Sequence, residues 1–198
     1  MIFDYPDFRN HRRHGPRGYA NYEGYRPWLR DEFTFRCAYC LKREHWGPIT
    51  GEFDIDHFQP QRLRPDLAAE YTNLVYACRR CNSVKSELTV DDPFIVMCGT
   101  RIVTRTDGTV RGLDGEASRV VLILDLNSPR LVEWRITWMR IIDLAAERDL
   151  LLLQKLAGFP ADLPRLRRLR PPAGNSRPEG IAESWAELAD QGELPGLY

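Results

Sequence analysis

The spacing of apolar residues predicts a helix near the start of the chain, preceded by an irregular arm. From Tyr25 to Phe35 the apolar side chains Trp28, Leu29 and Phe33 recur at helical spacing. The residues before this segment are rich in Pro, Gly, Arg and Tyr and show no clear period. We therefore expect residues 1–23 to lie over the domain as an arm that leads into the helix.

Two short strands and a helix are predicted next. Residues from Glu52 to Phe58 alternate between two faces, one apolar with Phe53 and Ile55 and one acidic with Asp54 and Asp56. A second strand is predicted over Leu74 to Ala77. A helix is predicted to begin near Cys81.

The second half of the chain is mainly helical in pattern. Alternating residues flank Asp107-Gly108, which is a strong signal for a β-hairpin. The segment 114–126 fits either a helix or a strand. The longest helical pattern runs from Arg130 to Ala157, and its apolar stripe consists of Leu131, Trp134, Trp138, Ile141, Ile142, Leu144 and Ala145.

The C-terminal part is interrupted by prolines. Five prolines fall within residues 160–180, which predicts a linker or a wrapped loop. A short amphipathic helix is predicted over Ile181 to Ala189. The whole pattern indicates an α+β fold in four parts: an arm and helix (1–34), a core (35–92), a hairpin and helical extension (93–158) and a proline-rich tail with a short helix (159–198).

Composition narrows the class of protein without indicating a partner. The 198 residues are 43% hydrophobic and 28% charged, as in ordinary globular proteins. No apolar run approaches the ~20 residues that span a bilayer, and the N-terminus lacks the pattern of a signal peptide. The sequence therefore predicts a cytoplasmic protein that does not enter a membrane.

Net charge is zero, but arginines gather locally. Lys and Arg together number 28, as do Asp and Glu, so the overall charge does not argue for a polyanionic partner. Arginines cluster between Arg9 and Arg30 and again between Arg165 and Arg170. Each cluster is either a solvated surface or a set of guanidinium groups whose geometry suits phosphate.

Four of the five cysteines form two C-x-x-C pairs. They are Cys37, Cys40, Cys78 and Cys81. Two such pairs can complete a tetrahedral shell of thiolates around zinc, and a closed shell leaves no position for a substrate. We therefore expect a structural zinc ion, so any chemistry must come from the residues that it holds in place. The fifth, Cys98, is expected to be a buried apolar residue.

Polar residues that could bind a metal ion, accept a proton or bind phosphate lie between and after the cysteine pairs. Asp56 offers a carboxylate and Asn82 an amide oxygen, which are ligands that a magnesium-type ion prefers. His57 titrates near neutral pH and can accept a proton from water. Asn73 can orient the loop or the imidazole, and three cations can meet phosphate: Arg79, Arg80 and Lys85.

At these residues the sequence resembles the HNH nucleases of the ββα-metal superfamily. The matching motifs are CAYC at 37–40, DHFQP at 56–60, TNL at 72–74 and CRRCNSVK at 78–85. The resemblance implies a zinc-stapled core of two strands and a helix, in which His57 is the general base and Asn73 constrains the loop. It further implies that Asp56 and Asn82 hold one divalent ion and that Lys85 or a nearby arginine adds positive charge at the phosphate.

The sequence departs from the family pattern at two places. Asn82 stands where many members have His, and its oxygen favours a hard ion, Mg²⁺ or Mn²⁺. The loop from Gln61 to Glu70 lacks the glycine pair common there. The flanking regions are similar to small bacterial HNH proteins, some of which accompany ATPases in anti-phage defence systems.

The resemblance implies a metal-dependent endonuclease that hydrolyses DNA phosphodiester bonds. Two alternatives stay open. One is a nuclease subunit that is latent until it binds a partner such as a defence-system ATPase. The other is a zinc module that binds nucleic acid or protein without catalysis, which would contain zinc but no second metal ion.

Overall fold

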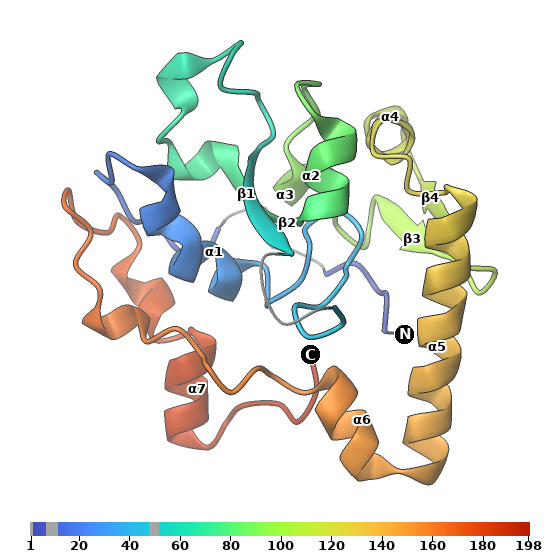
Figure 1. Cartoon of the computed structure of the whole chain (residues 1–198). Helices are drawn as coiled ribbons and strands as arrows, with labels where there is room; N and C mark the ends of the chain where they lie inside the picture. The colour runs from blue at the N-terminus through green and yellow to red at the C-terminus, as the bar shows by residue number, and fades with distance from the viewer. Residues whose placement is uncertain (1, 7–11, 48–51) are drawn as a thin grey trace.

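The computed structural model describes residues 2–6, 12–47 and 52–198, so Arg9 and Gly51 lie outside the described residues. Figure 1 shows the arrangement of the elements. They are α1 (Arg26–Glu32), β1 (Phe53–His57), β2 (Leu74–Cys78), α2 (Arg79–Lys85), α3 (Pro93–Val96), β3 (Ile102–Thr104), β4 (Val110–Gly112), α4 (Gly115–Ile123), α5 (Pro129–Arg148), α6 (Leu150–Ala157) and α7 (Trp185–Gln191).

The centre of the fold is an antiparallel β1–β2 hairpin followed directly by α2. Phe53 pairs with Cys78 and His57 with Leu74 across the hairpin. The mixture of helices with two small antiparallel sheets confirms the α+β class with a ββα core and a helical extension. Both predicted strands are present within a residue of their expected ends. The helix begins at Arg79, two residues before Cys81, because Cys78 is still extended and serves as its N-cap residue.

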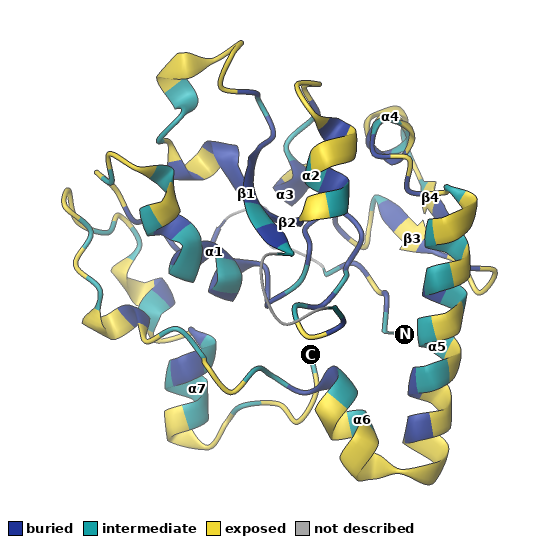
Figure 2. Cartoon of the chain, viewed as in Figure 1, coloured by how far each residue is buried: buried dark blue, intermediate teal, exposed yellow. Residues whose placement is uncertain are grey.

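The hairpin is small and depends on its surroundings. Two strands of this length are marginal on their own in water. Here β1 and β2 are buried along almost their whole length, and the rings of Phe53 and Tyr76 stack across them at 4.8 Å. Helix α1 packs against β2 and buries Trp28 and Leu29, as its apolar spacing predicts. In Figure 2 the hairpin strands are largely buried, whereas much of α2 is exposed.

The long C-terminal helix differs from the sequence prediction. The pattern over 130–157 divides at Asp149 (φ −152°, ψ 88°), and the Asp149 side chain accepts a hydrogen bond from the Leu152 N–H to cap α6. Leu144 belongs to the apolar stripe of the helix but does not reach the core, because it is 58% exposed. Helical spacing identifies an apolar stripe, but it does not show how far along the helix a packing partner extends. Figure 2 shows that α6 is also largely exposed.

Segment 114–126, whose pattern fits either a helix or a strand, contains the helix α4. Its N-cap residue is Asp114, whose carboxylate accepts a hydrogen bond from the Ala117 N–H. The predicted hairpin at Asp107-Gly108 is confirmed as β3 and β4, with Gly108 in the left-handed region at φ 77°. The one-turn helix α3 was not predicted, because four residues carry no helical period.

The arm and the tail lie against each other. Pro16 and Asn175 form an isolated β-bridge, and the Arg17 N–H donates to the Gly174 carbonyl at 2.9 Å. Of the two possibilities for residues 160–180, the structure therefore shows the wrapped loop. None of the helices formed by the described residues has the length and apolarity needed to cross a bilayer.

Ion pairs engage much of the two arginine clusters. In the tail, Arg165 pairs with Asp190 and Arg167 with Glu187. In the arm and α1, Arg13 pairs with Asp31 and Arg30 with both Glu44 and Asp162. These guanidinium groups serve contacts within the fold, which the sequence did not anticipate because their partners are distant in the chain.

Candidate functional site

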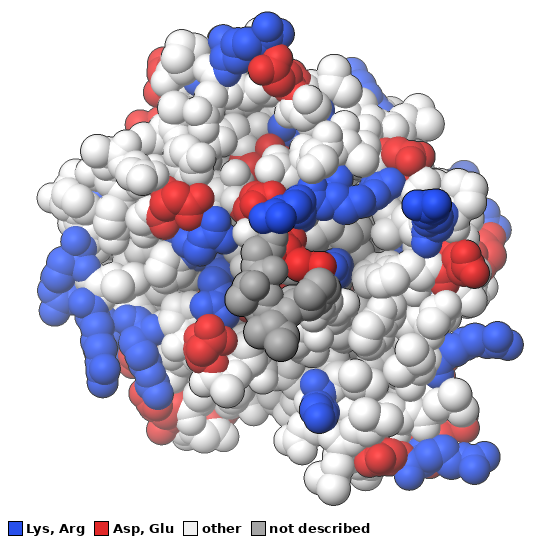
Figure 3. Space-filling view, in the orientation of Figure 1, with Lys and Arg blue, Asp and Glu red and all other residues white. Residues whose placement is uncertain are grey.

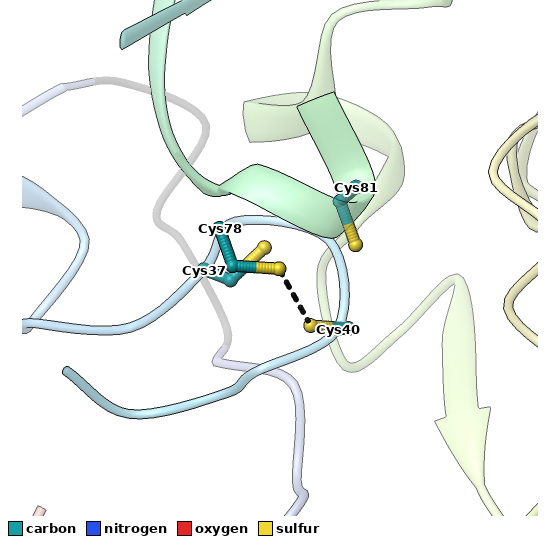
Figure 4. Close-up of side chains that lie close together, drawn as sticks. All are labelled: Cys37, Cys40, Cys78 and Cys81. Carbon is teal, nitrogen blue, oxygen red and sulfur yellow. Dashed lines mark hydrogen bonds between the residues drawn. The ribbon is translucent and has the colours of Figure 1, made fainter. Parts of the chain in front are cut away.

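The four paired cysteines converge beneath the hairpin. Cys37 and Cys40 belong to the turn that precedes β1, Cys78 ends β2, and Cys81 lies in the first turn of α2 (Figure 4). All four are buried, and their sulfur atoms lie within 4.8 Å of one another. The sulfurs of Cys40 and Cys78 are 3.7 Å apart, and none of these cysteines forms a disulfide.

This geometry fits a tetrahedral zinc ion. Zn–S bonds of about 2.3 Å place the sulfurs of a tetrahedral site about 3.8 Å apart. Burial raises the pKa of the Cys37 thiol, so a cation is needed to stabilise the thiolate form. Cys98 lies apart, buried, with its thiol 3.2 Å from the Ile95 carbonyl, as expected for a residue outside the cluster.

His57 ends β1 and is almost completely enclosed, with 7% of its surface exposed. Its Nε2 lies 2.8 Å from the Ala68 carbonyl, which can only accept, so this nitrogen carries the proton. The Gln61 amide nitrogen lies 3.1 Å from Nδ1 and 3.0 Å from Nε2, and the Tyr22 ring contacts the imidazole edge to face at 4.8 Å. Burial lowers the pKa of His57, although the Ala68 carbonyl and Asp56 oppose this effect.

Asn73 fixes the loop that joins β1 to β2. Its side chain is buried, and its Oδ1 accepts a hydrogen bond from the Gln59 N–H at 3.0 Å. Its Nδ2 donates to the carbonyls of Gln59 at 3.0 Å and Leu67 at 3.3 Å. The amide therefore joins two ends of the loop that carries Ala68, the partner of His57.

Asp56 is held by two donors and is only 4% exposed. The Lys85 ammonium lies 2.9 Å from Oδ1, and the Tyr39 hydroxyl donates to Oδ2 at 2.6 Å. Lys85 is itself 1% exposed, so this ion pair joins β1 to α2 in the interior. The sequence analysis did not predict the contact of Tyr39 with Asp56. The position of Tyr39 between Cys37 and Cys40 could have indicated it, because the cysteine pair fixes the backbone there.

Asp56 and Asn82, the two residues expected to share an ion, are not joined by a hydrogen bond. The side chain of Asn82 instead contacts Asp54. The Asn82 amide nitrogen lies 3.3 Å from Asp54 Oδ2, and both side chains are half-buried. Asp54 and Asp56 share the face of β1 that α2 covers, one opposite Asn82 and the other opposite Lys85. These carboxylate and amide oxygens are the donor set that a hard divalent cation prefers, so the residues fit such an ion.

The two arginines that begin α2 differ in their availability. The Arg80 guanidinium donates to the Leu124 and Asp125 carbonyls and to the Ser128 hydroxyl, so it links α2 to the start of α5 rather than standing free. Arg79 is exposed, and no described residue pairs with its guanidinium. Both line a cavity of about 790 Å³ together with Arg130. Figure 3 shows a band of basic side chains across this face, with acidic groups beside it.

The hairpin and the helix form a ββα unit that the four-thiolate cluster holds together, with a histidine at the end of the first strand. Residues 37–88 match the family model of the HNH endonucleases. The match includes all four clustered cysteines and every predicted site residue. Comparison of the chain with curated proteins gives no significant match. The HNH domain supports nuclease activity on nucleic acid.

Substitution of one clustered cysteine is expected to remove the zinc ion. Cys78→Ser should reduce bound zinc from about one ion per chain to near zero and lower the thermal stability, because a closed four-thiolate shell loses a ligand. Elemental analysis and thermal unfolding measure both effects.

The matched control is Cys98→Ser, in which the hydroxyl can replace the thiol near the Ile95 carbonyl. This variant should keep its zinc. Equal zinc content in the Cys78 variant and the wild type would show that the cluster is not the zinc site.

Proposed function

We propose that this protein is a metal-dependent endonuclease that hydrolyses DNA phosphodiester bonds, with His57 as the general base. The observation that carries the proposal is the position of the His57 imidazole. It ends β1 inside the matched HNH segment, and the loop fixed by Asn73 orients it through the Ala68 carbonyl. The carboxylates of β1 lie on the same strand, where α2 covers them.

The tautomer of His57 determines which nitrogen acts. Because Nε2–H donates to the Ala68 carbonyl, Nδ1 holds the free electron pair. The Gln61 amide nitrogen lies about equally far from Nδ1 (3.1 Å) and Nε2 (3.0 Å). A water molecule that takes its place beside Nδ1 can give its proton to that nitrogen as it attacks phosphorus. Asn73 holds the loop and so keeps the imidazole in this orientation.

Asp56 and Asn82 are the proposed ligands of one Mg²⁺ or Mn²⁺ ion, and Asp54 lies beside Asn82 as a further oxygen donor. Such an ion, when bound, stabilises negative charge at the scissile phosphate and at the leaving oxygen. Lys85 shares the Asp56 carboxylate, so its ammonium group is close enough to the site to add positive charge there.

Phosphate contacts are proposed for the basic side chains at the start of α2. Arg79 is the best placed, because it is exposed and has no partner among the described residues. Arg80 contributes through its position at the same cavity, although its guanidinium already binds four groups of the α4–α5 connection: the Leu124 and Asp125 carbonyls, the Asp125 carboxylate and the Ser128 hydroxyl. Binding through such contacts weakens as salt concentration rises and depends little on base sequence.

A second candidate is a nuclease that is latent until a partner protein binds, for which an ATPase of a defence system is one possibility. The observation that favours it is the enclosure of His57. Gln61, Tyr22 and the Ala68 carbonyl surround the imidazole, so substrate access needs a movement of the loop after β1. A partner that moves Gln61 and Tyr22 away from the imidazole, while the Ala68 carbonyl keeps its hydrogen bond to Nε2, would switch the site on.

Replacement of the proposed base is expected to abolish most of the cleavage. His57→Ala should reduce the rate at which supercoiled plasmid is nicked in the presence of Mg²⁺ or Mn²⁺ by about 10²- to 10⁴-fold, because the attacking water loses its proton acceptor. Gel electrophoresis of the plasmid over time measures the rate.

His45→Ala is the matched control, since His45 is exposed and its imidazole nitrogens lie within hydrogen-bond distance of the Leu156 carbonyl and the Tyr198 hydroxyl, away from His57 and its partners. It should cut at the wild-type rate. Equal rates for His57→Ala and wild type would contradict the role of His57. A folded, zinc-loaded wild type that does not cut would favour the latent nuclease or the non-catalytic zinc module.

The proposed ligands are expected to control the affinity for Mn²⁺. Asp56→Asn and Asn82→Ala should each weaken Mn²⁺ binding by about tenfold or more, as loss of one ligand or its support does at other metal sites. Electron paramagnetic resonance of free Mn²⁺ measures this affinity without any requirement for cleavage.

Asp54→Asn is the informative comparison, because Asp54 contacts Asn82 while Asp56 is held by Lys85 and Tyr39. If only the Asp54 and Asn82 variants lose affinity for Mn²⁺, then Asp54 rather than Asp56 is the carboxylate ligand. Unchanged affinity in all three variants would exclude this site for the ion.

A further inference from the structure

Four large apolar side chains are exposed to solvent where α5 ends and α6 begins. Leu144 is 58% exposed, Leu150 70%, Leu151 81% and Leu152 41%. They fall within residues 144–152, on either side of Asp149, so they gather at the corner that the two helices form at the edge of the molecule (Figures 1 and 2). We call these four residues the corner leucines.

The corner leucines expose enough apolar surface to form the centre of an interface. Single exposed leucines are ordinary, whereas a contiguous patch of several of them marks an interaction surface. Together they leave a few hundred Å² of apolar surface in water, which is a large part of the ~800 Å² that each partner contributes to a standard interface. Removing this surface from water would be the main favourable term in association.

The charged side chains around the corner leucines indicate which partner fits. Three are positive and three are negative, all are exposed, and none forms an ion pair with another described residue: Arg140, Arg148, Lys155, Asp143, Glu147 and Asp149. This differs from the arm and α1, where Arg13 and Arg30 are paired within the chain. A surface with equal numbers of both signs does not attract a strongly charged partner, but it can be complementary to a copy of itself.

The order of the charges along α5 fits a two-fold axis beside Leu144. Arg140 lies four residues before Leu144 and Glu147 three residues after it, so the three side chains share one face of the helix. Within one chain Arg140 and Glu147 are two helical turns apart and form no ion pair. If two α5 helices pack antiparallel about that axis, Arg140 of each copy lies opposite Glu147 of the other.

We propose that the corner leucines and this face of α5 form the interface of a symmetric homodimer. The leucines of the two copies pack together, and two Arg140–Glu147 pairs flank them. The β1–β2 hairpin and α2 lie in a different part of the molecule, so the candidate nuclease site of each copy stays outside the interface (Figure 1). The interface goes beyond the proposed nuclease function and does not depend on it.

A dimer would also affect how the chain cuts a duplex, and this consequence alone rests on the proposed function. Each chain has one His57, so it hydrolyses one phosphodiester bond at a time. Two copies held together could cut both strands of a duplex in one encounter.

Sedimentation equilibrium of the zinc-loaded full chain tests the proposal. The wild type should show a reversible equilibrium between monomer and dimer across the micromolar range. Leu151→Asp should raise the dissociation constant of the dimer by about tenfold or more, because it places a carboxylate in an apolar contact.

Leu122→Asp on α4 is the matched control, because Leu122 is 79% exposed and lies outside the corner. Its dissociation constant should equal that of the wild type. A chain that sediments as a monomer at every concentration would overturn the proposal, as would equal dissociation constants for the Leu151 and Leu122 variants.

Charge reversal tests the antiparallel arrangement. Arg140→Glu and Glu147→Arg should each raise the dissociation constant by about threefold or more, because each places like charges opposite one another twice per dimer. The double variant should restore the wild-type value. Both positions are exposed, so the variants should fold, which circular dichroism checks.

A double variant that dimerises no better than the single variants would contradict the antiparallel arrangement. His57→Ala should dimerise like the wild type. Sedimentation requires no cleavage, so a failure of the nuclease proposal and a failure of the dimer proposal give different results.

Discussion

The four-thiolate cluster is the constraint on which the candidate site depends. It joins the turn at Cys37 and Cys40 to the end of β2 and the first turn of α2, so a single tetrahedral ion would fix both sides of the ββα unit. A hairpin of two five-residue strands has little stability by itself. The cluster therefore stabilises this small hairpin, as neighbouring strands would in a larger sheet. The edge of the hairpin and α2 then remain available for chemistry.

The cysteine cluster and the site around Asp56 and His57 are structurally coupled. Tyr39 lies between the first two cysteines and donates to Asp56, and Lys85 reaches the same carboxylate from α2. The position of Asp56, and with it the neighbouring His57, is set by groups that the cluster holds. The opposite side of His57 depends on the loop fixed by Asn73.

The sequence predicts the elements better than it predicts their partners. Local signals were sufficient for the strands, the cysteine quartet and the Asp107-Gly108 turn, because alternation, ligand spacing and turn chemistry are local properties. They could not show that Asn82 contacts Asp54, or that Arg80 is bound to the start of α5, because those partners are set by how α2 crosses the hairpin. The exposure of Leu144 was missed for the same reason: an apolar stripe does not reveal where the core ends.

Hydrogen exchange with and without zinc tests most directly whether the cluster holds the site in place. The amides of β1, β2 and α2 should be protected in the zinc-loaded chain and lose most of their protection after chelation. Those of the first turns of α5, which pack through the Trp134 contacts with Phe3 and Trp46, should keep more of theirs. Unchanged protection across β1, β2 and α2 after complete removal of zinc would contradict the account, because the hairpin and helix would then be stable without the ion.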